Sequence, residues 1–229
     1  MKNVTAIILA GGVGSRMNSD ITKQNIVLLG KTVLERTLDA FCRSSLVTDL
    51  ILVARQEELA DIISIISGID TKRISLVSGG NTRAQSAKNG FMAIGEKTDF
   101  VAIHDCARCL ITPDMIDSVI KVAFEKGAAT AACKVTDTVK LVDDNRRIIS
   151  TIPREKVYRA QTPQVFSKDL YQKALLNAAD KLDLATDDNM LVEEIGGRIE
   201  CVDLGAYNIK ITVAEDIPFA EFILKQRGE

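Results

Sequence analysis

The sequence predicts an α/β fold built on a mostly parallel, doubly wound sheet. Short apolar runs, the first at residues 4–9, alternate with segments whose apolar residues recur every three or four positions. The first pattern is typical of strands buried on both faces of a sheet, and the second of helices that cover it. Alternation at this spacing indicates βαβ units, so we expect a Rossmann-like arrangement. Residues 136–159 interrupt the alternation, and we expect them to form a protruding β-hairpin arm.

The expected elements follow one another with short connections. Strands are predicted at residues 4–9, 50–54, 74–77, 100–103, 128–135, 199–204 and 208–213. Helices are predicted at residues 33–41, 59–66, 84–91, 116–124, 167–179, 186–195 and 214–226. Within the arm, two strands at 138–142 and 147–152 flank a turn-like segment. An isolated hairpin is marginal in water, so the arm must pack on something.

The composition is that of an ordinary globular protein. A length of 229 residues and 46% hydrophobic residues allow one well-packed core, so we expect a single domain over residues 1–229. The formal net charge is −2, and no basic surplus attracts nucleic acid. No apolar run reaches the roughly 18 residues of a membrane span, and no export signal is recognisable. We therefore expect a cytoplasmic protein that binds neither nucleic acid nor membranes.

The five cysteines predict reduced thiols in that compartment. Cys106 and Cys109 have the spacing of a redox or zinc pair, but the single histidine, His104, is too close in sequence to complete a zinc site. We expect His104 to be structural, and Cys133 and Cys201 to be small core residues.

A glycine-rich turn follows the first predicted strand. Gly11, Gly12 and Gly14 allow the backbone to take positive φ and to expose N–H groups, as loops that cradle phosphate do. Arg16 and Lys23 add two cations within reach of the same anion. A glycine-rich turn alone would merely end a strand, and the two cations favour a phosphate loop.

Two named phosphate motifs do not fit this turn. The dinucleotide fingerprint requires a third glycine where the chain has Met17, and a P-loop requires a Gly-Lys-Ser/Thr ending that is absent. The segment resembles instead the signature of sugar-nucleotide pyrophosphorylases and cytidylyltransferases: an apolar strand, a glycine loop, Arg-Met, and a lysine a few residues later.

Further motifs extend the resemblance over nearly the whole chain. They lie at residues 103–108, 136–140, 161–164, 186–188 and 208–212. Their order and spacing resemble the 2-C-methyl-D-erythritol 4-phosphate cytidylyltransferase family. The resemblance implies transfer of CMP from CTP to a polyol phosphate, release of pyrophosphate and a requirement for Mg²⁺ or another divalent cation.

The resemblance also assigns roles to residues. It implies that Arg16, Lys23 and Lys210 are catalytic cations, and that Asp105, at the end of a predicted strand, holds the metal ion. The family pattern matches CTP-binding positions at Ala10, Gly11, Gly12, Gly14, Gly80, Asn81, Ser86, Asp105 and Cys106. It matches acceptor-binding positions at Arg108, Thr138, Arg154, Thr162 and Thr186. Thr138 and Arg154 belong to the arm, so the family pattern implies a homodimer in which each arm enters the partner's acceptor pocket.

Several positions depart from the family pattern. Asn81 stands where an aspartate is common, Thr22 and Cys109 replace prolines, and Tyr158 replaces a tryptophan. Ribitol 5-phosphate cytidylyltransferases share the same motifs, so ribitol phosphate is an alternative acceptor; residues 104–108 and 153–154 favour methylerythritol phosphate.

Two other classes of function share this fold class. The first is an NAD-dependent oxidoreductase, against which the missing third glycine counts. The second is a non-catalytic protein that senses nucleotides, which would bind CTP without releasing pyrophosphate.

Overall fold

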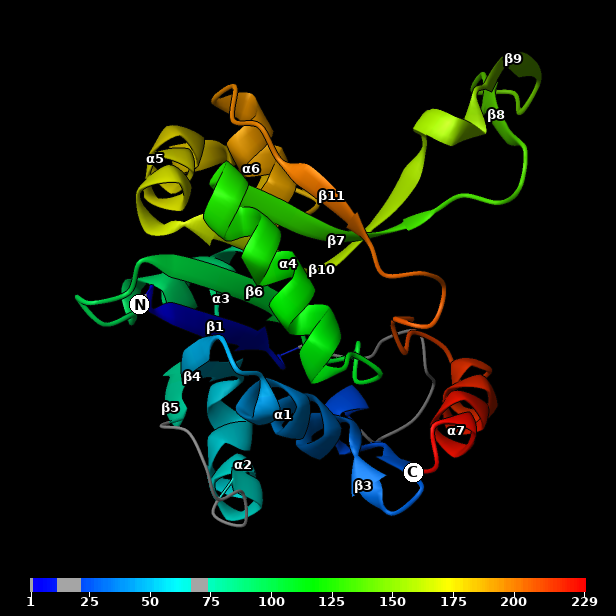
Figure 1. Ribbon diagram of the computed structural model, residues 1–229. Coiled ribbons are helices and arrows are strands. Elements are labelled where there is room, and N and C mark those ends of the chain that lie inside the picture. Colours follow the sequence, from blue (N-terminus) through cyan, green and yellow to red (C-terminus); the bar gives the residue numbers. More distant parts are fainter. Residues whose placement is uncertain (1, 12–21, 67–73) are drawn as a thin grey trace.

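A seven-stranded mixed sheet runs through the part of the chain that the computed structural model describes, which is residues 2–11, 22–66 and 74–229 (Figure 1). In spatial order its strands are β11 (Glu200–Asp203), β7 (Ala128–Lys134), β10 (Tyr158–Ser167), β6 (Phe100–Asp105), β1 (Val4–Leu9), β4 (Val47–Ala54) and β5 (Ile74–Ser78). Strands β6, β1, β4 and β5 are parallel neighbours, as are β7 and β11, whereas β10 is antiparallel to both β6 and β7. The predicted doubly wound, mostly parallel sheet is confirmed.

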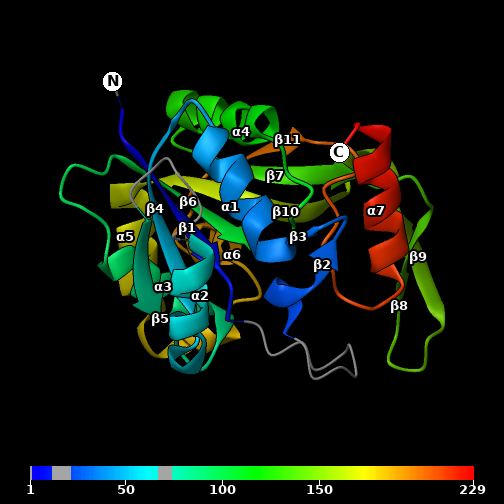
Figure 2. The same ribbon diagram turned by 90° about the horizontal axis from the view of Figure 1, so that it is seen from below.

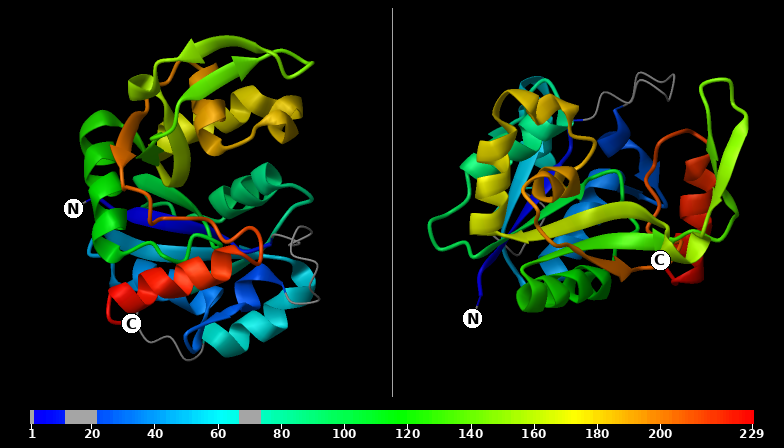
Figure 3. Two further views of the ribbon diagram at one scale, coloured as in Figure 1. Left: turned by 90° about the vertical axis from the view of Figure 1, so that its right-hand side faces the viewer. Right: turned by 90° about the horizontal axis from the view of Figure 1, so that it is seen from above.

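Helices cover both faces of this sheet. They are α1 (Val33–Arg43), α2 (Leu59–Ile66), α3 (Arg83–Met92), α4 (Pro113–Lys126), α5 (Lys168–Ala178), α6 (Asp188–Glu194) and α7 (Asp216–Gln226). Two apolar clusters separate the faces: Ile8 packs in one cluster with residues of α1, α4 and α7, and Ile7 packs in the other with residues of α3, α5 and α6. Figures 2 and 3 show the sheet between these layers. Because neighbouring strand residues point to opposite faces, β1 is buried on both sides.

The shorter elements complete the described chain. They are the 3₁₀ turns η1 (Lys23–Asn25), η2 (Gln56–Glu58), η3 (Arg154–Lys156) and η4 (Ala179–Leu184), and the two-stranded pairs β2 (Val27–Leu28) with β3 (Lys31–Thr32) and β8 (Val139–Val142) with β9 (Ile148–Ile152). None of the helices in the described ranges combines the length and apolar composition that crossing a membrane requires.

The β8–β9 pair is the predicted arm. It leaves the sheet after β7, turns, and returns through η3 into β10, and it projects from the body of the molecule in all views (Figures 1 and 3). Its side chains are mostly exposed, including Leu141, Val142, Ile148 and Ile149. The returning strand re-enters the main sheet at Tyr158, where it pairs with Lys134.

Local signals explain most of the helix starts. Thr112 caps α4 by accepting a hydrogen bond from Met115 N, and Pro113 follows in the first turn, as expected from the sequence. Gly127 ends the same helix in the left-handed conformation that glycine adopts without strain. Thr32 and Glu35 form a capping box at α1.

The expected strand at residues 208–213 is wrong. This segment buries Asn208 and Ile211, but Ile211 N donates to Ala107 O, in the turn after β6, at 2.8 Å, and the segment joins no strand of the described sheet. The two buried residues are three positions apart, which does not fit the two-residue period of a strand.

The burial expected for Cys201 is also wrong. Cys201 lies on β11, the edge strand of the sheet, and is exposed, whereas Cys42, Cys106, Cys109 and Cys133 are buried. An edge strand has one neighbour only, so fewer side chains cover it.

Candidate active site

The carboxyl ends of β1, β4, β5 and β6 lie along one edge of the sheet, because these strands are parallel. Backbone hydrogen bonds join their ends: Ala10 N donates to Val53 O at 2.8 Å, Gly79 N to Ala54 O at 2.8 Å, and Cys106 N to Leu9 O at 3.0 Å. In open α/β sheets this edge is where ligands bind. It carries the described part of the glycine loop, Ala10 and Gly11. The predicted loop residues Gly12, Gly14 and Arg16 lie outside the described residues.

The turn expected to read the cytosine base opens α3. Gly80 has no room for a side chain, because a Cβ atom there would lie 2.4 Å from the Cβ of Gln85. Gly80 N donates to Ser86 Oγ at 3.1 Å, and Asn81 N donates to Gln85 Oε1 at 3.0 Å. The structure thus brings the predicted residues Gly80, Asn81 and Ser86 together at the first turn of a helix, where side chains of that turn bond the N–H groups of Gly80 and Asn81.

Asp105 is held between two cations. Its Oδ1 accepts from Arg83 Nε at 2.9 Å and its Oδ2 accepts from Lys210 Nζ at 2.7 Å. Burial alone would raise the pKa of the Asp105 carboxyl, but the guanidinium of Arg83 and the ammonium of Lys210 outweigh burial and hold that pKa well below its usual range. The carboxylate is therefore ionised at neutral pH and is available to a hard cation.

Thr162 and His104 fix the backbone beside Asp105. Asp105 N donates to Thr162 Oγ1 at 3.0 Å, and the same hydroxyl lies 3.1 Å from His104 Nδ1. His104 is fully buried in β6, and its ring packs on Phe41 with the ring centroids 4.8 Å apart. This burial agrees with the expected structural role of His104.

Arg108 lies in the turn after β6. Its Nη1 donates to Asn208 O at 3.0 Å, whereas its buried Nε has no hydrogen-bond partner among the described residues. Burial lowers the pKa of the Arg108 guanidinium, and Arg83 and Arg159 lower it further, while Asp105 opposes them. A guanidinium remains charged across this range, so Arg108 is a cation with spare donors beside Asp105.

A cavity of about 240 Å³ brings most of these groups together. It is lined by Arg83, Asp105, Arg108, Ala160, Gln161, Thr162, Gln164, Thr186, Asp187 and Lys210. Five of the predicted site residues share this cavity: Asp105, Arg108, Thr162, Thr186 and Lys210. Three cations against two carboxylates leave a surplus of positive charge, as expected for a pocket that takes a phosphate.

Lys23 is hydrogen-bonded to the 208–213 segment, which contributes Lys210 to this cavity. Its Nζ donates to Thr212 O at 3.0 Å and to Ile211 O at 3.3 Å. Lys23 and Lys210, the two described residues that the family pattern predicts as catalytic cations, are far apart in the sequence, but Lys23 bonds the short segment that carries Lys210.

Two predicted acceptor-binding residues do not line this cavity. Thr138 and Arg154 are exposed on the arm, where Arg154 Nη1 donates to Thr136 O at 2.8 Å. Cys106 directly follows Asp105, but its thiol is buried in an apolar cluster, and its backbone N–H and C=O bond Leu9 and Thr37. Burial also raises the pKa of the Cys109 thiol to about 12 and that of Cys106 above its usual range.

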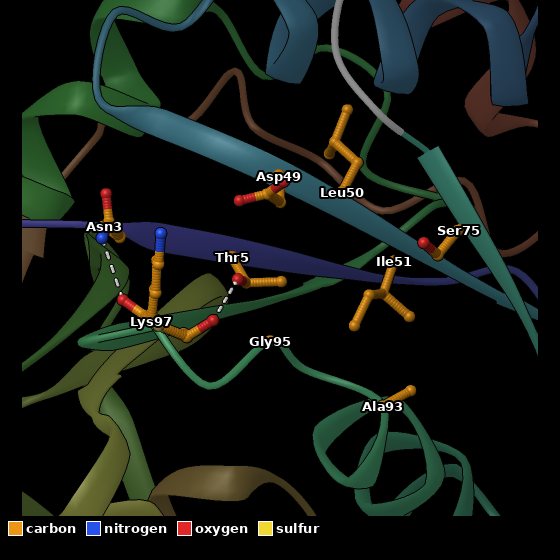
Figure 4. A pocket seen from close by; sticks show the side chains of 10 residues that line it. Asn3, Thr5, Asp49, Leu50, Ile51, Ser75, Ala93, Gly95 and Lys97 are labelled. Atoms are coloured by element: carbon orange, nitrogen blue, oxygen red, sulfur yellow. Dashed lines mark hydrogen bonds between the residues drawn. The ribbon is translucent and has the colours of Figure 1, made fainter.

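A second cavity, of about 290 Å³, lies at the opposite, amino-terminal edge of the sheet (Figure 4). Its polar groups largely bond one another: Thr5 Oγ1 and Thr98 Oγ1 are 2.7 Å apart, and Asn3 Nδ2 donates to Lys97 O at 2.9 Å. It is lined by one lysine and one aspartate, which give it no surplus charge for a nucleotide. The first cavity is therefore the better candidate for chemistry.

Comparison with known proteins identifies the family of this chain. The profile of the 2-C-methyl-D-erythritol 4-phosphate cytidylyltransferase family matches residues 4–226. The chain belongs to this family. The protein of this name from Desulforamulus reducens is 39% identical over 230 residues, which cover 100% of this chain and 98% of that protein. The one from Haemophilus influenzae (strain PittGG) is 39% identical over 223 residues, 97% of each chain.

Solved structures show the same fold. A 4-diphosphocytidyl-2C-methyl-D-erythritol synthase from Anaerococcus prevotii superposes with a TM-score of 0.88 and 32% identity, and covers 98% of this chain and 99% of its own. The cytidylyltransferase from Thermus thermophilus has a TM-score of 0.77 and 26% identity, and covers 98% of this chain and 100% of its own. The alternative acceptor and the oxidoreductase function are not favoured, because the family and these relatives are methylerythritol phosphate enzymes by name.

Sequence reasoning missed Arg83 in this cytidylyltransferase. It is the first residue of α3, and it donates to Asp105 and to Asp188, which is the first residue of α6. The sequence predicts Asp188 only as part of a helix start. The available signal was the placement of an arginine at a helix N-terminus, where the helix dipole disfavours a cation unless anions surround it.

Sequence reasoning includes Gln164 only as a member of the motif at residues 161–164. In the structure its side chain links β10 to the start of α6 through hydrogen bonds. Its Nε2 donates to Asp187 Oδ2 at 2.8 Å, and its Oε1 accepts from Asp188 N at 2.9 Å. Asp187 in turn caps α6 by accepting from Met190 N at 3.1 Å. The start of α6 is thus fixed against the strand that lines the cavity.

The fully buried His104 predicts how stability changes with pH. Burial lowers its pKa from 6.5 to about 3, so the folded protein keeps the ring neutral while the unfolded chain takes up a proton below pH 6.5. The unfolded state therefore binds more protons, and stability falls as pH decreases. We expect the free energy of unfolding to drop by about 2 kcal/mol between pH 7.5 and pH 5 through this group, as measured by urea denaturation.

The variant His104→Gln is the control for this prediction. His104 is the only histidine of the chain, so the variant has no side chain with an ordinary pKa near 6.5. Its stability should be nearly constant between the two pH values. An equally steep dependence in the variant would assign the effect to other groups.

Proposed function

We propose that this protein transfers CMP from CTP to 2-C-methyl-D-erythritol 4-phosphate, giving 4-diphosphocytidyl-2-C-methyl-D-erythritol and pyrophosphate. Membership of the cytidylyltransferase family supports the reaction. The observation that carries the proposal is the cavity in which Asp105, Arg108 and Lys210 meet at the carboxyl edge of the sheet, with Lys23 hydrogen-bonded to the segment that carries Lys210. We also place the reaction in the cytoplasm, where reduced thiols and a nucleotide substrate are compatible.

The chemistry needs charge neutralisation more than proton transfer. A phosphate oxygen of the acceptor attacks the α-phosphorus of CTP, a new P–O bond forms, and the bond to the β-phosphate oxygen breaks as pyrophosphate leaves. A phosphate monoester is largely ionised near pH 7, because its second pKa is about 6, so no general base is required. Negative charge grows on the α-phosphate oxygens, and preorganised cations stabilise it.

The described cations suit this task. Lys210 lies 2.7 Å from Asp105 and is partly exposed in the cavity, and Lys23 is held by two backbone carbonyls close by. We assign to these lysines, together with Arg16, the stabilisation of charge at the α-phosphate. Arg108, whose guanidinium has spare donors, is assigned to the phosphate of the acceptor.

Asp105 is the residue that would hold a divalent cation. Its carboxylate is ionised, and one of its two partners, Lys210, has a side chain that is 41% exposed and is able to move. In the described residues no group of three or more His, Cys, Asp or Glu side chains is placed to hold a metal. A single carboxylate fits Mg²⁺, which takes most of its ligands from substrate phosphates and water and supplies charge neutralisation between the two polyanions.

The variant Asp105→Asn tests this assignment. A neutral amide is a poorer ligand than a carboxylate, so we expect the Mg²⁺ concentration for half-maximal rate to rise by at least about 10-fold. The control is Asp117→Asn, which removes a buried carboxylate that bonds Ser44 and Ser45 away from the cavity. A magnesium titration that is unchanged in Asp105→Asn, or changed equally in the control, would remove Asp105 from the metal site.

The arm supports the proposal of a homodimer. It exposes apolar side chains on an isolated hairpin, with Ile148 65% and Ile149 62% exposed, and nothing in the described part of the chain covers them. A two-fold pair of arms would bury these faces against each other or against the partner. In that dimer each arm brings Thr138 and Arg154 to the acceptor pocket of the other chain.

The acceptor is tested directly by pyrophosphate release. Wild-type protein is assayed with CTP and Mg²⁺ against methylerythritol phosphate, ribitol 5-phosphate and a sugar 1-phosphate. We expect turnover with methylerythritol phosphate. A higher rate with ribitol 5-phosphate would mean that the acceptor is ribitol phosphate, while the class of reaction stays the same. CTP binding without pyrophosphate release in the presence of any of these acceptors would contradict the proposed catalysis.

A further inference from the structure

Arg83 occupies an unusual place for a cation. It is the first residue of α3, directly after the cap residue Thr82, whose hydroxyl accepts from Gln85 N at 3.1 Å. The N-terminus of a helix carries a partial positive charge, so an arginine there is disfavoured unless carboxylates compensate. Two carboxylates do so, and they come from distant parts of the chain.

The first carboxylate belongs to the site and the second does not. Arg83 Nε donates to Asp105 Oδ1 at 2.9 Å, and its Nη1 donates to Asp188 Oδ2 at 2.7 Å. Asp105 lines the cavity, whereas Asp188 does not and its side chain is only 1% exposed. Among the described residues, the carboxylate of Asp188 therefore contacts the lining of the cavity through Arg83.

Asp188 is itself firmly held. Its Oδ1 accepts from Tyr171 Oη at 2.6 Å, and its backbone N–H donates to Gln164 Oε1 at 2.9 Å. Tyr171 is fully buried and stacks on Phe166, with the ring centroids 5.4 Å apart. Breaking the bond to Tyr171 or to Arg83 would leave a buried carboxylate oxygen without that partner, which is costly, so these bonds hold the carboxylate in place.

The two partners of Asp105 consequently differ in freedom. Arg83 is also bonded to Asp188, and its planar guanidinium fixes the direction as well as the length of its hydrogen bond to Asp105. Lys210 is a point charge on a flexible stem, and its side chain is 41% exposed. Of the two carboxylate oxygens of Asp105, one is anchored to the protein core and the other is bound to a side chain that can leave.

We propose that Arg83 is a positioning residue for the CMP transfer: it fixes Asp105 Oδ1 to the buried Asp188, so that Asp105 keeps its orientation when Lys210 leaves Oδ2 for the phosphates of the substrate. The proposal rests on the proposed function for the identity of the reaction. Arg83 acts through Asp105, so its loss should affect the metal dependence and the rate rather than the binding of the acceptor.

Two variants test the connection from its two ends. Arg83→Lys keeps one positive charge but cannot donate to both carboxylates from a fixed fork, and Asp188→Asn removes the anchoring charge outside the cavity. The control is Arg36→Lys, because Arg36 is another buried arginine, which donates to Leu28 O and pairs with Glu229 at 2.8 Å. Each protein is first melted, and all assays are run well below its unfolding temperature.

The first measurement is calorimetric and does not depend on turnover. The Mg²⁺ concentration needed for half-maximal CTP binding should rise by about 10-fold or more in Arg83→Lys and Asp188→Asn, as is usual when a group that orients a metal ligand is lost. In steady-state assays kcat should fall by a similar factor while KM for the acceptor changes little. Arg36→Lys should lose thermal stability without either effect.

The contrary result is equally clear. If both variants are destabilised but keep the wild-type magnesium dependence and kcat, Arg83 is only a structural link between helices and the proposal is wrong. If Asp188→Asn does not fold, the magnesium dependence and kcat of Arg83→Lys alone decide between these outcomes. In the wild type, the NMR signal of the Arg83 Nε–H should exchange slowly both with and without Mg²⁺ and CTP, and its loss on nucleotide binding would overturn the proposal.

Failure of the reaction itself would be distinguishable. Wild-type protein that releases no pyrophosphate would contradict the proposed function. If its magnesium-dependent CTP binding still weakened in both variants, the positioning of Asp105 by Arg83 would stand.

Discussion

Lys23→Ala should lower kcat by about 100-fold or more, while the affinity for CTP changes much less. The ammonium of Lys23 is held at 3.0 Å from Thr212 O and 3.3 Å from Ile211 O, beside the segment that carries Lys210. Neutral carbonyls are weaker partners than a phosphate oxygen that gains charge in the transition state. The contribution of Lys23 is therefore greatest when that charge develops. Steady-state kinetics and calorimetric CTP binding measure the two effects separately.

The matched control is Lys31→Ala. Lys31 is 57% exposed, lies 3.8 Å from Asp39 and does not line the cavity, so its removal should leave kcat unchanged. We expect Arg16→Ala to behave like Lys23→Ala, on the strength of its place in the family pattern. If Lys23→Ala loses affinity for CTP but keeps the wild-type kcat, the lysine binds CTP in the ground state and does not stabilise the transition state further.

The fold was predictable because its signals are local. The apolar run at residues 4–9 and the capped start of α4 at Thr112 each reflect a few neighbouring residues, and the structure has both. Strand β10 had no such signal. Its buried stretch includes Gln161, Thr162 and Gln164, which are polar, and its register with β7 shifts between residues 160 and 164 around Pro163. These polar residues are buried because each bonds another part of the chain: Gln161 Oε1 accepts from Asn208, Thr162 Oγ1 accepts from Asp105 N, and Gln164 Nε2 donates to Asp187.

The candidate site was predictable only in part for a similar reason. Parallel strands align their carboxyl ends, so Asp105 and the Gly79–Gly80 turn could be grouped from the order of the elements. The pairing of Arg83 with Asp188 could not be predicted from the order of the elements. The two residues are 105 positions apart, and neither is unusual within its own segment. The family motifs predicted residues that line the cavity, such as Asp105 and Lys210. The buried contacts that orient those residues needed the structure.

Mixing two inactive variants should restore activity if each site is built from two chains. A Lys23→Ala subunit lacks a catalytic cation of its own site, and an Arg154→Ala subunit lacks the cation that its arm brings to the partner's site. A mixed dimer then has one doubly damaged site and one intact site. Random reassortment makes half of the dimers mixed, so activity should return to about a quarter of the wild-type value.

The structure supports this division of roles. Arg154 is exposed in η3, at the base of the projecting β8–β9 pair, and its side chain donates to the neutral carbonyl of Thr136, which a phosphate on another chain could replace. Its guanidinium is a bidentate donor suited to that phosphate.

Lys156, an exposed cation in the same turn, provides the matched control for this experiment. The subunits carry different tags, so that mixed dimers are purified and counted before the assay. Lys156→Ala should be active alone. After it is mixed with Lys23→Ala, the total activity should not exceed that of the Lys156→Ala subunits present. Absence of recovery in dimers that are shown to be mixed would mean that Arg154 serves the site of its own chain. A fully active wild-type monomer would exclude shared sites altogether, because an arm cannot complete the pocket of a partner that is not there.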